Sequence, residues 1–134
     1  MNRKTIINAI EQVATSLGYE FYCDGEQQMP VAVSRYPALW LAPPQFLKIE
    51  GRKHGKITYS VKVYAMVDGL KFWSPMRNSK LIKLEEDLVQ IFAEVSQKEG
   101  VVTVNNLKMS NNQKTHHTHG ELVMMATAEV VTFF

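Results

Sequence analysis

The sequence has little cysteine and little net charge. Its 134 residues include one cysteine, Cys23, which excludes an internal disulfide bond. The chain contains 15 lysines and arginines and 13 aspartates and glutamates, for a net charge of +2. Nucleic-acid-binding domains carry far more basic surfaces, so we expect no sequence-specific contact with nucleic acid.

Long apolar segments are also missing. No run approaches the roughly 18 apolar residues that a transmembrane helix needs. The N-terminus leads into an amphipathic stretch and lacks the apolar core of a signal peptide. We therefore expect a protein that is made in the cytoplasm and has no contact with a membrane.

Motifs of common catalytic and cofactor sites do not occur in the sequence. There is no GxSxG elbow, HExxH pair, P-loop or GxGxxG loop. Cys23 lies among aromatic residues and is interpreted as a small, half-buried hydrophobe. Glu85, Glu86 and Asp87 fall on a segment with the pattern of a surface helix. We expect a protein that is not an enzyme and needs no cofactor.

Two further patterns bear on ligands. His116, His117 and His119 have metal-ligand side chains, but they lie in the polar loop 110–120 and not on separated rigid elements. A solvated loop is the simpler interpretation, and a small metal-binding protein stays an alternative. Residues 56–64 interleave lysines with Tyr59 and Tyr64, as single-strand binders do, although Tyr59 falls on an apolar face.

What is present predicts one globular domain, residues 1–134, with 46% hydrophobic and 21% charged residues. Apolar residues recur at helical spacing over residues 3–17 and again from about residue 75 or 79 to residue 97. In the second helix the stripe runs through Leu81, Leu84, Leu88, Ile91 and Val95, and Ile82 and Phe92 widen it.

Strand patterns fill most of the remaining chain. Residues 56–67 alternate with a period of two, which indicates a long half-buried strand. Residues 46–50, the loop 51–55 and this strand together predict a hairpin with a basic tip. Shorter strands are expected at 19–23, 31–33 and 38–41, and longer ones at 101–109 and 121–134. The fold class is therefore α+β: a mostly antiparallel sheet with both amphipathic helices packed on one face.

The second face of the sheet suggests an interface. On the long strand, Tyr64 and Met66 are more apolar than a solvated face requires. Charges at these two positions are expected to disrupt assembly while leaving the monomer folded, whereas a charge at Val63 is expected to unfold it. The closing strand is apolar on both faces, which indicates coverage by the protein or by another chain. The candidate subunit-interface residues are Arg52, Lys53, Tyr64, Met66, Val131 and Phe133.

The order of these elements resembles the tail terminator and tail-completion family of long-tailed bacteriophages. The matching pieces are the helix 3–17, the hairpin 46–67, the helix through 81–95, and the closing strand that ends TAEVVTFF at Phe134. The histidine-rich loop and the segment YPALWLAPP depart from the family. The resemblance implies a phage or prophage virion protein that forms a homo-oligomeric ring, often a hexamer. Such rings cap the tail tube, meet the head connector and have no active site.

A second hypothesis is a non-enzymatic binding module of unknown ligand. In such a module the sheet would be the scaffold and the loops would bind the ligand. A hydrophobic groove beside Trp40 and Trp73 would favour it, because exposed tryptophans are typical of contact surfaces.

Overall fold

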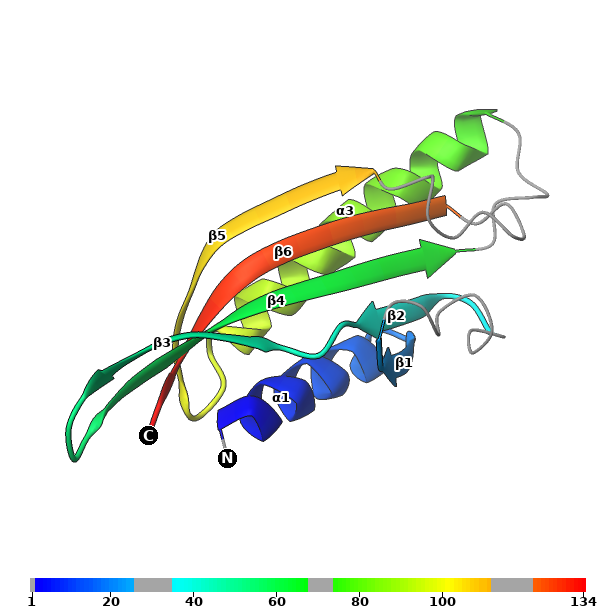
Figure 1. Cartoon of the computed structure of the whole chain (residues 1–134). Coiled ribbons are helices and arrows are strands. Elements are labelled where there is room, and N and C mark those ends of the chain that lie inside the picture. Colours follow the sequence, from blue (N-terminus) through cyan, green and yellow to red (C-terminus); the bar gives the residue numbers. More distant parts are fainter. Residues whose placement is uncertain (1, 26–34, 68–73, 112–121) are drawn as a thin grey trace.

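The computed structural model describes residues 2–25, 35–67, 74–111 and 122–134, which form an α+β domain (Figure 1). The strand expected at 31–33, Trp73 and all three histidines of the polar loop lie outside these residues. The elements, in chain order, are α1 (Asn2–Ser16), β1 (Glu20–Cys23), β2 (Ala38–Leu41), β3 (Gln45–Gly51), β4 (Gly55–Val67), α3 (Ser74–Val95), β5 (Val101–Asn111) and β6 (Leu122–Phe133).

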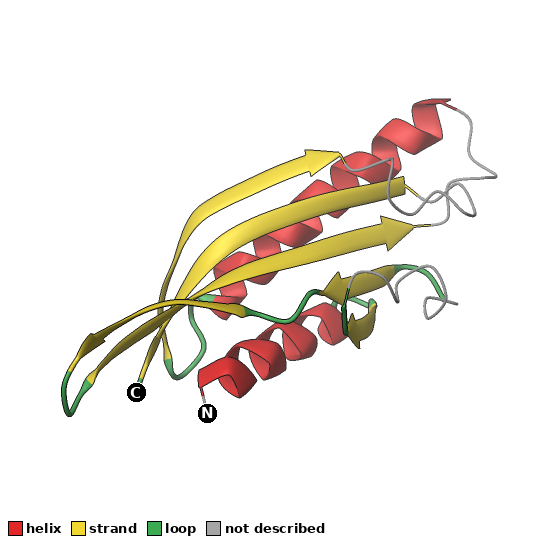
Figure 2. Cartoon of the chain, viewed as in Figure 1, coloured by secondary structure: helices red, strands yellow, loops and turns green. Residues whose placement is uncertain are grey.

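Both helices form where the apolar periodicity predicts them. Helix α1 buries Ile6, Ile10 and Val13, and Gly18 follows it with a φ of +90°, the left-handed conformation that glycine adopts at helix ends. Helix α3 begins at Ser74, one residue before the earlier of the two expected starts, and buries its stripe from Leu84 to Val95. The apolar faces of both helices pack on one side of the sheet (Figure 2).

The sheet has the strand order β1-β2-β4-β6-β5, and β3 pairs separately with β4. All pairings are antiparallel except that of β1 with β2. Strand β4 is 13 residues long and pairs with β6 from Lys56 opposite Phe133 to Val67 opposite Leu122. The long strand and its hairpin with β3 are therefore confirmed.

The ladders of this sheet are interrupted in several places, including register shifts at Phe46–Lys48 and Val101–Thr103. At Asn105–Lys108 the register of β5 against β6 also shifts, and Asn106 has a φ of +56°, as in a β-bulge. Between β2 and β3, Pro43 and Pro44 lack the amide hydrogen that a continuing ladder needs. One edge of β4 therefore pairs first with β3 and then, after this break, with β2.

The sheet has a core on each face. The helix-side core contains the apolar faces of α1 and α3 together with Val61, Val63 and Ala65 of β4. The second core lies on the opposite face and consists of Ala38, Trp40, Tyr64, Met66 and Val123, with Tyr22, Tyr36 and Met125 packed against it. The first part of β6 contributes to both cores, with Val123 and Met125 on one face and Met124 and Ala126 on the other, which explains why this part of the strand is apolar on both faces.

Candidate subunit-interaction surface

The hairpin projects past the ends of both helices (Figure 1). We call residues 45–60 the arm: strand β3, the tip 52–54 and the first residues of β4. Every residue of β3 is exposed, including three large apolar side chains. Phe46 is 52% exposed, Leu47 49% and Ile49 55%. Large apolar groups clustered on a projecting element are typical of protein contact sites.

The arm continues the face of the sheet that binds the helices. Phe46 pairs with Tyr59 and Ile49 pairs with Ile57, and directly opposed residues place their side chains on the same face. Tyr59 belongs to the helix-side core and Ile57 packs against it. Phe46 and Ile49 therefore lie on the helix side of the sheet, where about half of each side chain is left exposed.

The base of the arm is fastened to the start of α1. The ring of Phe46 meets that of Tyr59 edge-on, with 6.1 Å between centroids, and the Arg3 guanidinium lies 5.4 Å from the Tyr59 centroid. Arg3 also donates a hydrogen bond to the carbonyl of Pro44. The side-chain amide of Asn2 donates to the Thr132 hydroxyl at 2.7 Å. These contacts set the direction in which the arm leaves the domain.

The tip of the arm is a tight turn whose base contacts Phe134. Gly51 has a φ of +100°, and a Cβ atom there would lie 2.5 Å from the carbonyl oxygen of His54. Phe134 donates its amide hydrogen to the carbonyl of Gly55 at 3.0 Å. The last residues of β6 therefore support the base of this turn.

The arm is cationic. Lys48, Arg52, Lys53 and Lys56 are all exposed, against the single carboxylate of Glu50, which forms a surface ion pair with Lys48 at 3.3 Å. Exposed ion pairs contribute little to stability, so these charges bear on recognition more than on folding.

Four of the expected interface residues lie at or near the arm. Arg52 and Lys53 are exposed at the tip, and Phe133 is 57% exposed where it pairs with Lys56. Val131 is half-buried and pairs with Thr58. The structure thus brings these residues together at one end of the sheet, where their contact with a neighbouring subunit stays a prediction.

The other two residues require a correction. Tyr64 is 2% exposed and Met66 1% exposed, because both lie in the second core. The expectation that they form a face open to another subunit is wrong. Trp40 is 1% exposed in the same core, stacks on Tyr22 at 5.6 Å and donates its indole hydrogen to the carbonyl of Asp24. It does not line a ligand groove.

A second exposed apolar patch lies on the outer side of α3, and sequence reasoning missed it. Ile82 was assigned to the buried stripe, but it is 56% exposed, and Val89 is 45% exposed. The two residues are seven apart and therefore share one side of the helix with the exposed Ala93. The sequence did contain a signal for this patch, since Ile82 and Val89 are two apolar residues at helical spacing on an otherwise charged side of the helix.

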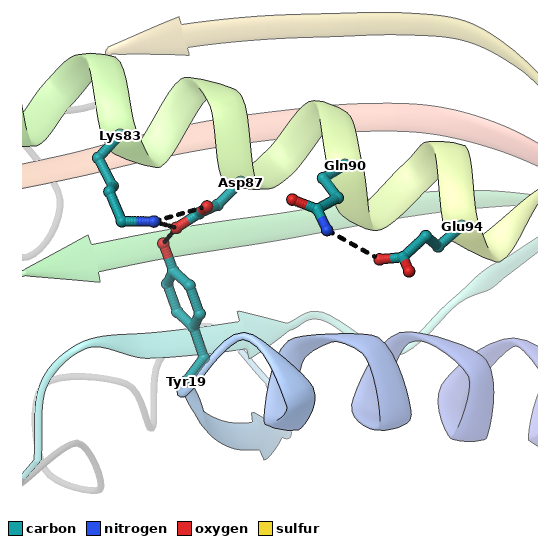
Figure 3. Close-up of polar contacts among 5 residues, drawn as sticks. All are labelled: Tyr19, Lys83, Asp87, Gln90 and Glu94. Carbon is teal, nitrogen blue, oxygen red and sulfur yellow. Dashed lines mark hydrogen bonds and ion pairs between the residues drawn. The ribbon is translucent and has the colours of Figure 1, made fainter.

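The inner edge of α3 carries a polar cluster, formed with Tyr19, three residues after the end of α1 (Figure 3). Tyr19 donates to Oδ2 of Asp87 at 2.6 Å, and Nζ of Lys83 donates to both carboxylate oxygens at 3.0 and 3.2 Å. The Asp87 side chain is 7% exposed. Burial, then the hydrogen bond and charge of Asp87, raise the pKa of the Tyr19 phenol. The cluster links the segment after α1 to α3, and both oxygens of the Asp87 carboxylate accept hydrogen bonds within it.

A Tyr19→Phe variant measures the contribution of this cluster. We expect a loss of about 1–2 kcal/mol in the free energy of unfolding at pH 7, because a hydrogen bond to a buried carboxylate is removed. The raised pKa means that the folded state holds the phenol neutral. The contribution of Tyr19 is therefore complete below its ordinary pKa of about 10 and declines as the pH rises above it.

Urea unfolding of both proteins at pH 7 and above pH 10 checks this expectation. The difference between wild type and variant should shrink at the higher pH. A difference that is the same at both values would contradict the assignment of the phenol as a neutral donor.

The described residues contain no group of three or more histidine, cysteine or acidic residues that could hold a metal ion. Cys23 is exposed and not half-buried as expected, yet partial desolvation and the nearby Asp24 and Glu11 carboxylates raise the pKa of its thiol, which disfavours the nucleophilic thiolate. Tyr59 and Tyr64 are buried, so neither offers a ring face for stacking bases.

Comparison with known proteins gives a similarity of fold. The fold is similar to that of a chain in a solved structure titled "Virion of native gene transfer agent (GTA) particle", with a TM-score of 0.51 and 12% sequence identity. The match covers 96% of this chain and 94% of that chain. No protein-family model matches the sequence, and no curated protein matches it. Among the described residues, no helix is long and apolar enough to cross a membrane.

Proposed function

We propose that this chain is a structural protein of a phage-type virion, which works by assembling with copies of itself and has no enzymatic activity. The observation that carries the proposal is the projecting arm, with Phe46, Leu47 and Ile49 each about half exposed. A stable monomer gains nothing from three such side chains on one strand, whereas an assembling subunit buries them in its neighbour.

The similarity of fold supports the same class of function. The similar chain belongs to a virion particle, and the match extends over nearly the full length of both chains. The element order that resembles tail terminators is present in the described residues: a helix, a hairpin on a long strand, a second helix and two closing strands. We therefore propose a tail terminator, a ring that caps the tail tube and joins it to the head.

This role defines the partners and the location. The ring, which is often a hexamer in the family that the sequence resembles, would contact tail-tube proteins on one side and head-connector proteins on the other. The protein would be made in the cytoplasm of the bacterial host and would finish in the virion. It would need no cofactor.

Light scattering coupled to size exclusion tests self-assembly on the purified, untagged protein. We expect the molar mass to rise with concentration from the 15.3 kDa of one chain towards a fixed multiple of it, because exposed apolar surface drives association. A closed ring gives a plateau, since every contact surface is then occupied. A protein that remains monomeric at the highest concentration and at both low and high salt would contradict the proposal.

A further inference from the structure

We infer that the arm of one copy docks on the outer side of α3 of the next copy, head to tail. This inference rests on the proposed self-assembly and names its contact surfaces. They are the arm residues Phe46, Ile49, Arg52 and Lys53, and the α3 residues Ile82, Glu85, Glu86 and Val89.

The arm is built to receive a helix. It extends the side of the sheet on which α1 and α3 already pack, and Phe46 and Ile49 are its uncovered apolar residues. The register of β3 shifts between Phe46 and Lys48, and Phe46 and Ile49 face the helix side of the sheet before and after this shift. A further helix with an apolar outer side would complete this layer.

Of the two described helices, α3 fits this requirement and α1 does not. The exposed residues of α1 are polar, among them Lys4, Asn8, Glu11 and Gln12. Those of α3 include Ile82 and Val89, which are 56% and 45% exposed. The outer side of α3 therefore presents exposed apolar side chains that can pack on the exposed apolar side chains of the arm.

The charges of the two surfaces are complementary. The arm carries Arg52, Lys53 and Lys56 around its tip. The exposed carboxylates of Glu85 and Glu86 flank the line from Ile82 to Val89 on α3. Opposite charges around apolar contacts set the register of an interface and speed its formation.

The two surfaces belong to different copies. Helix α3 (Ser74–Val95) lies along the sheet, and the arm projects beyond the ends of both helices (Figure 1), so the arm points away from the α3 of its own copy. A contact between two different patches on identical subunits is heterologous. Repeated by rotation, it produces a ring, whereas a self-complementary patch stops at a dimer.

Charge exchange between the surfaces tests the inference. One variant carries Arg52→Glu and Lys53→Glu, and a second carries Glu85→Lys and Glu86→Lys. Each variant alone places like charges on the two surfaces, and we expect its self-association to weaken about tenfold or more. An equimolar mixture, and a chain with all four substitutions, restore opposite charges and should restore assembly.

Controls use the exposed face of α1, where Lys4→Glu and Glu11→Lys, each made alone, reverse one charge outside the proposed contact. Circular dichroism verifies that each variant is folded. If the wild type assembles and the self-association of both the arm variant and the α3 variant is unchanged, the inference is overturned and the proposed function stands. The same conclusion follows if the self-association of both variants is weakened and mixing them does not restore it. A wild type that never associates would overturn the proposed function itself and the inference with it.

Discussion

A Met66→Lys variant is expected not to fold at neutral pH. The Met66 side chain is 1% exposed in the second core, so a lysine there would bury an ammonium group without a carboxylate partner. That burial costs several kcal/mol, a large share of the roughly 5–15 kcal/mol that stabilises a typical domain. Far-ultraviolet circular dichroism and a thermal melt measure the outcome, and Val63→Lys, on the opposite face of β4, should behave in the same way.

Phe133→Glu is the control for this experiment, since Phe133 is 57% exposed and a charge there stays in water. We expect this variant to keep the secondary structure and melting temperature of the wild type. If Met66→Lys were folded and monomeric, the second face of the sheet would be open to a neighbouring subunit, as the sequence alone suggested. The burial of Met66 argues against that result.

Truncation of Trp40 is expected to destabilise the domain by about 3–5 kcal/mol, the usual cost of removing a large buried aromatic side chain. A Trp40→Ala variant loses the stack on Tyr22, the hydrogen bond to the Asp24 carbonyl and the contacts with Tyr64 and Met66. Urea denaturation followed by circular dichroism gives the difference in unfolding free energy. Trp40→Phe keeps most of the apolar contact and should lose less.

A loss smaller than about 1 kcal/mol for Trp40→Ala would contradict the existence of a packed second core. It would also remove the reason for expecting Met66→Lys to unfold the protein. The two variants therefore test the same structural feature by different physical effects, a cavity in one case and a buried charge in the other.

Local periodicity was sufficient to predict the elements and the faces of the sheet. The spacing of Leu84, Leu88, Ile91 and Val95 places α3, and the alternation along residues 56–67 places β4 with Val61 and Val63 towards the helices. Such patterns state which side chains share a side. They do not state what covers that side, and for this reason Tyr64 and Met66 were placed on the correct face but were assigned to a neighbouring subunit.

The candidate interaction surface depended on tertiary structure. The segment FLKIE has the composition of an ordinary strand, and its exposure follows from the position at which the helices end relative to the hairpin. The same limit applies to Ile82, which lies at the edge of an apolar stripe whose width the sheet determines. The contact of Tyr19 with Asp87 joins residues 68 positions apart and leaves no local pattern.

The proline break between β2 and β3 has a mechanical consequence for the arm. Strand β4 pairs with β6 without interruption from Lys56 to Val67, whereas the ladder along its other edge is interrupted at Pro43 and Pro44, between the pairs of β2 and those of β3. A force on the arm is therefore carried into the domain by the ladder between β4 and β6 and not by the edge formed by β2 and β3. In the assembly proposed above, these two strands connect the contact at the arm to the core of each subunit.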